Sequence, residues 1–298
     1  MNTDREGANT PPHAESAESS YIGQEDFVVF RTIKHLQALI CQRAELLLQT
    51  EKNQFLGVSC IGPEDFSKLE QSRDRGTIPS GCKFDYDGEH LRLIVKMPGP
   101  RHEIPVSELV VTLAFQMQSL GIGRQNYVFA RATRFRGPTS TRSKEADEAF
   151  VPFGRVAPTN FPSFVIEVGV SEGIAVLRRD ADYWITNSGN ACNLVLLISL
   201  SRRAQIITFE LYQPTMVPGT VTRANPNPPQ VLRAGLVHPP IVLRANGVTS
   251  GPADLRLPLA ALFDTNPVPG TPAFLNQDIV VGAADLQIIY DNTFTYSI

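Results

Sequence analysis

The sequence predicts a mixed α/β fold, and three segments carry that prediction. Residues 161–172, FPSFVIEVGVSE, and 192–200, CNLVLLISL, have the dense apolar content of buried strands. The segment between them, 171–189, places its apolar residues at helical spacing, so the three together indicate a strand–helix–strand crossover. Residues 82–103 instead alternate apolar and polar side chains around Asp-Gly, which predicts a hairpin. A crossover and a hairpin in one chain favour a sheet of mixed strand direction.

Length and composition fit a folded protein of one elaborated domain or two small ones. The 298 residues are 42% hydrophobic and 19% charged. No apolar run reaches the ~18 residues of a membrane helix and no signal-peptide layout is present, so we expect no membrane partner. The four cysteines form no CxxC pair, which favours reduced thiols in an intracellular protein, nuclear or cytoplasmic. The net charge of −3 gives no bulk argument for nucleic-acid binding.

The first eighty residues are expected to hold a tail and a helical extension. Residues 1–24 are polar and lack periodicity, which is typical of a disordered tail. Between Asp26 and Lys52 apolar residues recur at helical spacing without Gly or Pro, which predicts one long helix or two. A loop through Pro63 and Pro79 follows. We therefore assign 25–80 to an N-terminal helical extension.

Residues 81–298 are expected to form the main domain. After the hairpin, Ser107 stands at the cap position of a helix that Gly121 ends. Next we expect a strand running into a basic loop over 126–137, followed by the crossover and a strand over 204–212. A Pro-rich extended or flexible insertion is expected over 214–240. Late strands and one short helical turn are expected within 254–263 and 278–291.

Two acidic residues stand out because of where they fall. Glu167 lies within the strand pattern FVIEVGV, where a carboxylate is costly to bury unless it is paired or binds a cation. Alternation places it on the face of Val165 and Gly169. Asp147 precedes AFVPF, a short extended segment suited to pair beside that strand. Carboxylates on adjacent strand ends form an oxygen-rich site for Mg²⁺ or Mn²⁺, ions that polarise a phosphodiester and activate water. The alternative is a structural salt bridge between Glu167 and Arg178 or Arg179 of the following helix, with Asp147 exposed.

A basic stretch leads into Asp147 without an acidic residue before Glu145. A nuclease needs cations near its carboxylates, because two carboxylates alone would repel a phosphate backbone. An alternative is a solvated loop with ordinary charge scatter. The residues expected to contact phosphates are Arg131, Arg134, Arg136, Arg142 and Lys144.

Several of these segments resemble a known family. Residues 84–120, with their Gly-containing hairpin, Met-Pro, His and amphipathic helix, are similar to the opening of the Uma family of predicted restriction endonucleases. KEADEAFVP and FPSFVIEVGVSE resemble that family's Pro-Asp and Glu-Val-x-Ser strands, and are closer still to a group of uncharacterised fungal proteins. The resemblance covers roughly Phe84 to Leu211, plus LPLAALF near the end. It implies the restriction-endonuclease-like fold of the PD-(D/E)XK nuclease superfamily, a mixed central sheet flanked by helices.

The resemblance also implies roles for individual residues. Asp147 matches the motif's aspartate and Glu167 its acidic strand residue, so both are expected to bind metal and serve catalysis. Ala146 replaces the motif's proline. Gly169 stands where the motif has a lysine that steadies the attacking water and the developing charge, and a glycine does neither.

Two further assignments follow from the same resemblance. Because the cation sometimes comes from the next helix, Arg178 and Arg179 are the available catalytic substitutes, although arginine stays protonated and is a poor proton shuttle. Glu103 opens the helix that packs beside the site together with His102, and is a further candidate metal ligand. A first-turn acid favoured by the helix dipole is the alternative for Glu103, and a loop-ordering hydrogen bond is the expected role of His102.

The sequence therefore predicts a metal-dependent endonuclease that hydrolyses phosphodiester bonds in DNA with Mg²⁺ or Mn²⁺. The alternative is a catalytically degenerate nuclease-fold module that binds nucleic acid or a protein partner. The missing motif lysine favours the module. The carboxylate retained on a buried strand favours the enzyme.

Overall fold

A computed structural model describes residues 27–50, 54–131, 133–138, 141–155, 160–170, 174–221, 223, 225–264 and 277–295. The predicted tail over 1–24 lies outside these residues. The described residues form a mixed α/β structure with six α-helices, which confirms the predicted class. None of these helices combines the length and the apolar content needed to span a bilayer.

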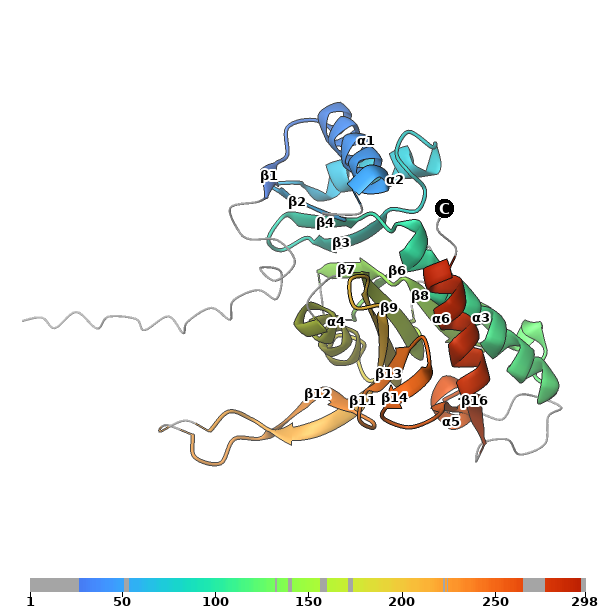
Figure 1. Cartoon of the computed structure of the whole chain (residues 1–298). Coiled ribbons are helices and arrows are strands. Elements are labelled where there is room, and N and C mark those ends of the chain that lie inside the picture. The colour runs from blue at the N-terminus through green and yellow to red at the C-terminus, as the bar shows by residue number, and fades with distance from the viewer. Residues whose placement is uncertain are drawn as a thin grey trace, which may run out of the picture.

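A six-stranded sheet with two helices on it forms the upper part of the molecule in Figure 1. Its strands, in spatial order, are β1 (Val28–Val29), β2 (Phe55–Ser59), β4 (Arg92–Lys96), β3 (Lys83–Asp87), β7 (Arg142–Glu145) and β6 (Arg134–Arg136). Helices α1 (Ile33–Thr50) and α2 (Pro63–Asp74) pack against it through a core that includes Ile40, Phe66 and Val95.

The predicted helical extension over 25–80 is only partly helical. Helix α1 falls within the expected helix, but β1 and β2 flank it, and α2 occupies most of the expected loop. Strand β2 pairs antiparallel with β4, from Phe55 opposite Lys96 to Ser59 opposite Arg92. Residues 25–80 therefore share a sheet with the hairpin that follows them. Their two strands are too short to give a clear alternation in the sequence.

The hairpin forms as predicted, with a different turn. Strands β3 and β4 pair antiparallel, with Asp87 opposite Arg92 at the closed end. The positive φ angle, 52°, falls on Leu91 and not on Gly88. The Asp87 carboxylate accepts hydrogen bonds from the backbone N–H groups of Glu89 and His90, at 2.9 and 3.2 Å. This side-chain bonding to the backbone, and not an Asp-Gly tight turn, reverses the chain.

The second sheet contains the crossover. Its path is β14 (Gly247–Ser250), β13 (Ile241–Arg244), β11 (Ile206–Pro218), β10 (Leu194–Ser201), β9 (Phe164–Val170), β8 (Glu148–Pro152) and β5 (Tyr127–Phe129), with β12 (Gln230–Leu236) paired to β11. Strands β9 and β10 are parallel and are joined by α4 (Ile174–Thr186), which confirms the predicted crossover. Val165 belongs to the core beneath α4, whereas Ile166 and Val168 belong to the core on the opposite face, as alternation predicts.

Helices α3 (Pro100–Ser119) and α6 (Ala283–Thr295) cover that opposite face (Figure 1). Helix α3 begins seven residues before the predicted cap at Ser107, since Gly99 is its N-cap and Pro100 its first residue. The earlier start places His102 and Glu103 in the first turn. The remaining elements are the 3₁₀ helix η3 (Arg124–Asn126), β15 (Leu255–Pro258), α5 (Leu259–Leu262) and β16 (Asp278–Val281), of which β15 and β16 pair with each other.

Two late segments differ from expectation. The Pro-rich stretch over 214–240 is extended, as predicted, but most of it forms a β-hairpin, in which β11 and β12 pair from Tyr212 opposite Leu236 to Pro218 opposite Gln230. Figure 1 shows this hairpin projecting from the second sheet. Within 278–291 only the first four residues are a strand, and residues from Ala283 onward belong to α6.

Candidate functional site

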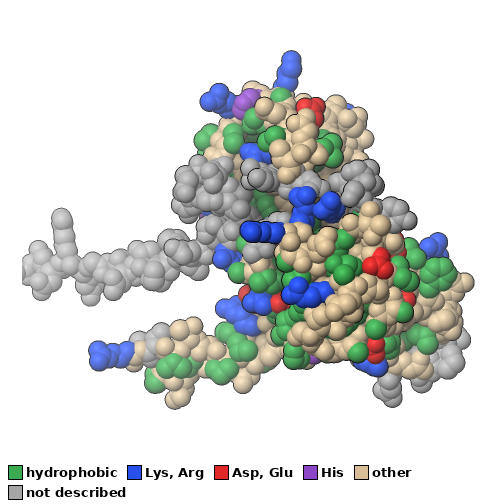
Figure 2. Space-filling model, in the orientation of Figure 1, with side chains coloured by type: hydrophobic (Ala, Val, Ile, Leu, Met, Phe, Trp, Pro, Cys, Tyr) green, Lys and Arg blue, Asp and Glu red, His purple; other side chains and the backbone are tan. Residues whose placement is uncertain are grey.

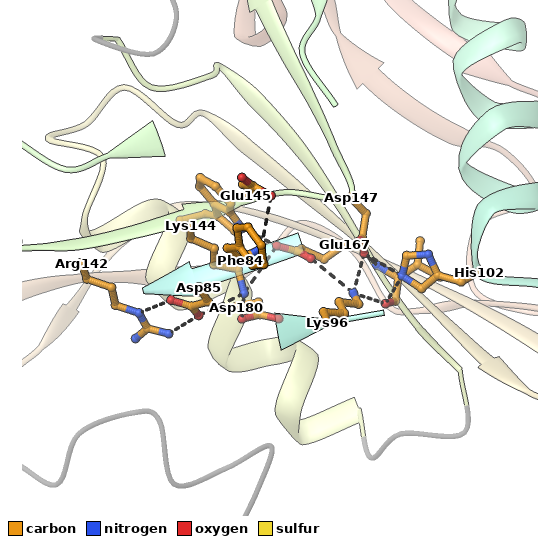
Figure 3. Close-up of polar contacts among 12 residues, drawn as sticks. Phe84, Asp85, Lys96, His102, Arg142, Lys144, Glu145, Asp147, Glu167 and Asp180 are labelled. Atoms are coloured by element: carbon orange, nitrogen blue, oxygen red, sulfur yellow. Dashed lines mark hydrogen bonds and ion pairs between the residues drawn. The ribbon is translucent and has the colours of Figure 1, made fainter. Parts of the chain in front are cut away.

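The structure brings together the two carboxylates that the sequence singles out. Asp147 lies between β7 and β8, and Glu167 lies in the middle of β9. Because β8 pairs antiparallel with β9, Asp147 reaches the β9 backbone, and its Oδ2 accepts a hydrogen bond of 2.7 Å from the N–H of Val168. Both carboxylate side chains are only 2% exposed. Figure 3 shows them side by side between the two sheets.

A lysine from the other sheet stands between them. Lys96, the last residue of β4, places its Nζ 2.7 Å from Asp147 Oδ2 and 3.8 Å from Glu167 Oε2. The same ammonium donates a hydrogen bond of 2.8 Å to the carbonyl of Val168. Three oxygen atoms from three residues therefore face one positive charge. The cation that Gly169 does not supply from β9 comes here from the first sheet.

His102 completes the surroundings of Asp147. Its side chain is fully buried, and its Nε2 lies 3.0 Å from Asp147 Oδ2 and 3.1 Å from the Val168 carbonyl. Burial lowers the pKa of His102, but the Asp147 carboxylate outweighs this effect and the net shift is upward. Burial would raise the pKa of Asp147, yet His102 and Lys96 hold it well below its usual range. Asp147 is therefore ionised at neutral pH, and Lys96 and His102 both contact its Oδ2.

Glu167 has the opposite protonation preference. Its Oε1 accepts a hydrogen bond of 2.7 Å from the indole N–H of Trp184, and Lys144 Nζ lies 3.7 Å from the same oxygen. Burial raises the pKa of Glu167 to about 8, because it outweighs the two nearby ammonium groups and Asp147 adds to the shift. The two carboxylates thus differ in charge at neutral pH, with Asp147 ionised and Glu167 protonated.

The charged network continues away from the carboxylates. Lys144 Nζ contacts the Asp180 carboxylate and lies 3.7 Å from Asp85 Oδ2. Asp85 accepts two hydrogen bonds from Arg142, of 2.8 Å from Nε and 2.5 Å from a terminal nitrogen. Figure 3 shows the alternation of acidic and basic groups from His102 to Arg142. Most of these groups are paired within the protein; the buried atoms of the network that lack a hydrogen-bond partner among the described residues are Asp147 Oδ1 and His102 Nδ1.

The predicted phosphate-contacting residues therefore serve mainly as internal partners. They lie on and beside β6 and β7, two strands of the first sheet, and not in one basic loop. Lys144 is only 7% exposed and pairs with Asp180, so its expected contact with phosphate is not open in this arrangement and stays a prediction. Acidic residues remote in sequence pair with the others: Arg131 with Glu103 at 2.8 Å, Arg134 with Glu70 at 3.0 Å, and Arg142 with Asp85. Arg136 is exposed and makes no ion pair among the described residues.

The remaining predicted residues lie beside the site or away from it. Glu103 pairs with Arg131, and its Oε1 is 3.7 Å from His102 Nδ1, so among the described contacts it reaches Asp147 through His102. Arg178 forms two hydrogen bonds with Glu210, of 2.9 and 2.7 Å, and Arg179 is exposed. Neither arginine pairs with Glu167 among the described residues. This arrangement therefore contains neither the structural salt bridge to Glu167 nor an arginine placed beside the carboxylates for catalysis.

Three observations bear on whether a metal fits this site. The described residues contain no group of three or more His, Cys, Asp or Glu side chains arranged to hold an ion. However, Asp147 Oδ1 is buried and has no hydrogen-bond partner among them. A cavity of about 20 Å³, lined in part by Lys96, Lys144 and Glu167 but not by Asp147, has room for about one water-sized species. The carboxylates and the Val168 carbonyl are hard oxygen donors, which is the ligand type that Mg²⁺ and Mn²⁺ prefer. One such ion would take the position that the Lys96 ammonium now occupies.

The oxygens of this site are of the kind that a small hard cation accepts, and the ammonium groups of Lys96 and Lys144 lie beside them. His102 and Glu167 are each able to hold a proton near neutral pH, as the directions of their pKa shifts show. Comparison with protein-family models and with curated proteins found no match to this sequence.

Proposed function

We propose that this protein is a metal-dependent endonuclease of restriction-endonuclease-like fold that hydrolyses phosphodiester bonds in DNA. The observation that supports it is the meeting of Asp147 Oδ2, Glu167 Oε2 and the Val168 carbonyl around Lys96 Nζ. The motif that these strands resemble combines an aspartate, an acidic strand residue and a lysine. The same three side-chain types meet here in space, with the lysine supplied by β4.

Each residue has a role that follows from its contacts. Asp147, Glu167 and the Val168 carbonyl would hold Mg²⁺ or Mn²⁺, which polarises a phosphodiester and lowers the pKa of a bound water. Lys96 lies within 4 Å of both carboxylates, where its positive charge would stabilise the negative charge that develops on a phosphate. His102 keeps Asp147 ionised and anchors it to β9. Trp184 fixes the orientation of the Glu167 carboxyl.

A degenerate module that binds nucleic acid or a protein is the second candidate, and burial favours it. The two carboxylates are almost wholly covered, and Lys96, His102 and Trp184 already contact each of their oxygens except Asp147 Oδ1. A phosphodiester reaches them only if the sheets separate locally or Lys96 turns away. In the degenerate module the ammonium stays in place and the ion pairs serve stability alone.

Cleavage of plasmid and oligonucleotide DNA with Mg²⁺ or Mn²⁺ tests the proposal. We expect the wild type to cut, and Asp147→Ala and Glu167→Ala to abolish cutting while near-UV circular dichroism stays native. Lys96→Arg should retain part of the activity, because it retains the charge. Arg203→Ala, an exposed residue in the β10–β11 turn, is the matched control and should cut normally. Cutting that survives in Glu167→Ala would contradict the proposal, and metal binding without any cutting would support the degenerate module.

A further inference from the structure

A cleft of about 540 Å³ opens between α4 and the base of the β11–β12 hairpin, apart from the buried carboxylates. Arg179 and Tyr183, one helical turn apart, line it from α4. Tyr212 lines it from β11, and Arg233 from β12. Figure 2 shows several Lys and Arg side chains over this region, with acidic side chains beside them. The volume lies in the range of small-molecule sites.

The charge of the cleft is positive after its internal ion pairs are counted. Its lining contains four arginines and, among the described residues, one carboxylate. Arg142 and Arg178 each form two hydrogen bonds with an acidic residue, Asp85 and Glu210, which fixes the planes of both guanidinium groups. With the lining carboxylate, Asp182, also subtracted, one positive charge remains.

The two arginines at the mouth are the more available ones. Arg179 is exposed and makes no ion pair among the described residues. Arg233 approaches Asp182 only to 3.5 Å, and 55% of its side chain is exposed. Arg179 and Arg233 lie on opposite walls, on α4 and on β12, so a ligand between the walls can contact both.

A buried hydroxyl provides an independent sign of a ligand. Tyr183 is 6% exposed, and its hydroxyl has no hydrogen-bond partner among the described residues. Arg142 stacks over the ring, 4.5 Å from its centroid, and holds the ring in place. Buried polar groups are rarely left without a partner. Burial raises the pKa of Tyr183, so its hydroxyl keeps its proton and can donate it to an anionic oxygen.

We propose that this cleft binds the phosphate group of a ligand about the size of a nucleotide. Arginine suits phosphate because its planar set of N–H donors matches two oxygens at once. Arg179 and Arg233 would contact the phosphate from the two walls, and the Tyr183 hydroxyl would donate to it from the floor. The phosphate belongs either to a free nucleotide or to one nucleotide of a strand. The proposal does not require the carboxylate site to bind metal or to cleave.

Calorimetric titration of the full chain with AMP and with a short single-stranded oligonucleotide tests this, with a chelator present so that metal-dependent cleavage plays no part. We expect the wild type to bind, and Arg179→Ala and Arg233→Ala each to weaken binding by about tenfold. Arg203→Ala is the control, because it removes the same charge at the opposite end of β10 and β11. Binding of both probes assigns the cleft to a free phosphate group, and binding of the oligonucleotide alone assigns it to a strand.

The hydroxyl is tested separately with Tyr183→Phe. We expect this variant to bind several-fold more weakly than the wild type and to melt at an unchanged or higher temperature. Three results would overturn the proposal: no binding of either probe to the wild type, equal weakening in Arg203→Ala, or unchanged affinity in Tyr183→Phe.

Discussion

Lys96 Nζ lies 2.7 Å from Asp147 Oδ2, although the two residues are 51 positions apart in the sequence. Lys96 ends β4 in the first sheet, and Asp147 lies where the chain passes from β7 in the first sheet to β8 in the second. The ion pair therefore joins the two sheets at the point where the chain crosses between them. The candidate site lies at this junction, so its ion pairs also hold the two sheets together.

Replacement of Lys96 should weaken the fold markedly. Lys96→Met leaves the buried Asp147 carboxylate with one cation fewer, and loss of one member of a buried ion pair costs about 3–5 kcal/mol. Lys96→Arg keeps the charge and should lose less. Urea unfolding of both variants measures the difference. A free energy of unfolding for Lys96→Met within about 0.5 kcal/mol of the wild type, the range of ordinary surface substitutions, would contradict this prediction.

The protonation of Glu167 predicts how stability depends on pH. Its pKa is raised from 4.5 to about 8, so between these values the folded protein holds a proton that the unfolded chain releases. The stabilisation is complete below pH 4.5 and is lost as the pH rises through about 8. Glu167→Gln cannot ionise but still accepts the Trp184 hydrogen bond. With a chelator present, the wild type should lose stability relative to this variant by on the order of 1 kcal/mol per pH unit over that interval. Parallel stability curves for the two proteins would show that the shift is absent.

Arg73 should be far more important than its neighbour Arg75. Arg73 forms two hydrogen bonds with Glu145, of 2.6 and 2.9 Å, and the Glu145 side chain is fully buried. Arg73→Ala leaves that buried carboxylate without its cation, which predicts a loss of about 3–5 kcal/mol in the free energy of unfolding. Arg75 is the C-cap of the same helix, and among the described residues its side chain hydrogen-bonds only to Gln71, at 3.5 Å, so Arg75→Ala should change stability by about 0.5 kcal/mol or less. Thermal melts compare the pair, and equal melting temperatures would refute the assignment.

The sequence predicts those parts of the fold that rest on local periodicity. The crossover from β9 through α4 to β10 is evident because each element carries a full apolar pattern within its own residues. Strands β2, β6 and β7 are missed because they are three to five residues long, and only their partners make them strands. The start of α3 is not predicted, because Pro98, Pro100 and Pro105 surround its first turn and proline is usually typical of loops.

The candidate site likewise has residues that local sequence patterns predict and residues that they do not. Asp147 and Glu167 are paired correctly because both are tied to one pair of neighbouring strands, β8 and β9. Lys96 is not predicted as a site residue, because it lies in the first sheet. Local sequence patterns do not show how that sheet is positioned relative to β9. The pairing of Arg178 with Glu210 is not predicted, because Glu210 lies 32 positions away on β11. Local charge therefore locates candidates, whereas long-range pairing decides which of them are free to act.

The hypothesis that Asp147 and Glu167 hold a divalent cation is tested most directly by Mn²⁺ titration observed through Trp184. Trp184 is the single tryptophan of the chain, and its indole N–H lies 2.7 Å from Glu167 Oε1. Paramagnetic Mn²⁺ at the carboxylates should quench its fluorescence saturably, in parallel with calorimetric binding of one ion per chain. Mg²⁺ should reverse the quenching, and Asp147→Asn should abolish it. Unquenched emission in the wild type at saturating Mn²⁺, or identical quenching in Asp147→Asn, would contradict the metal site.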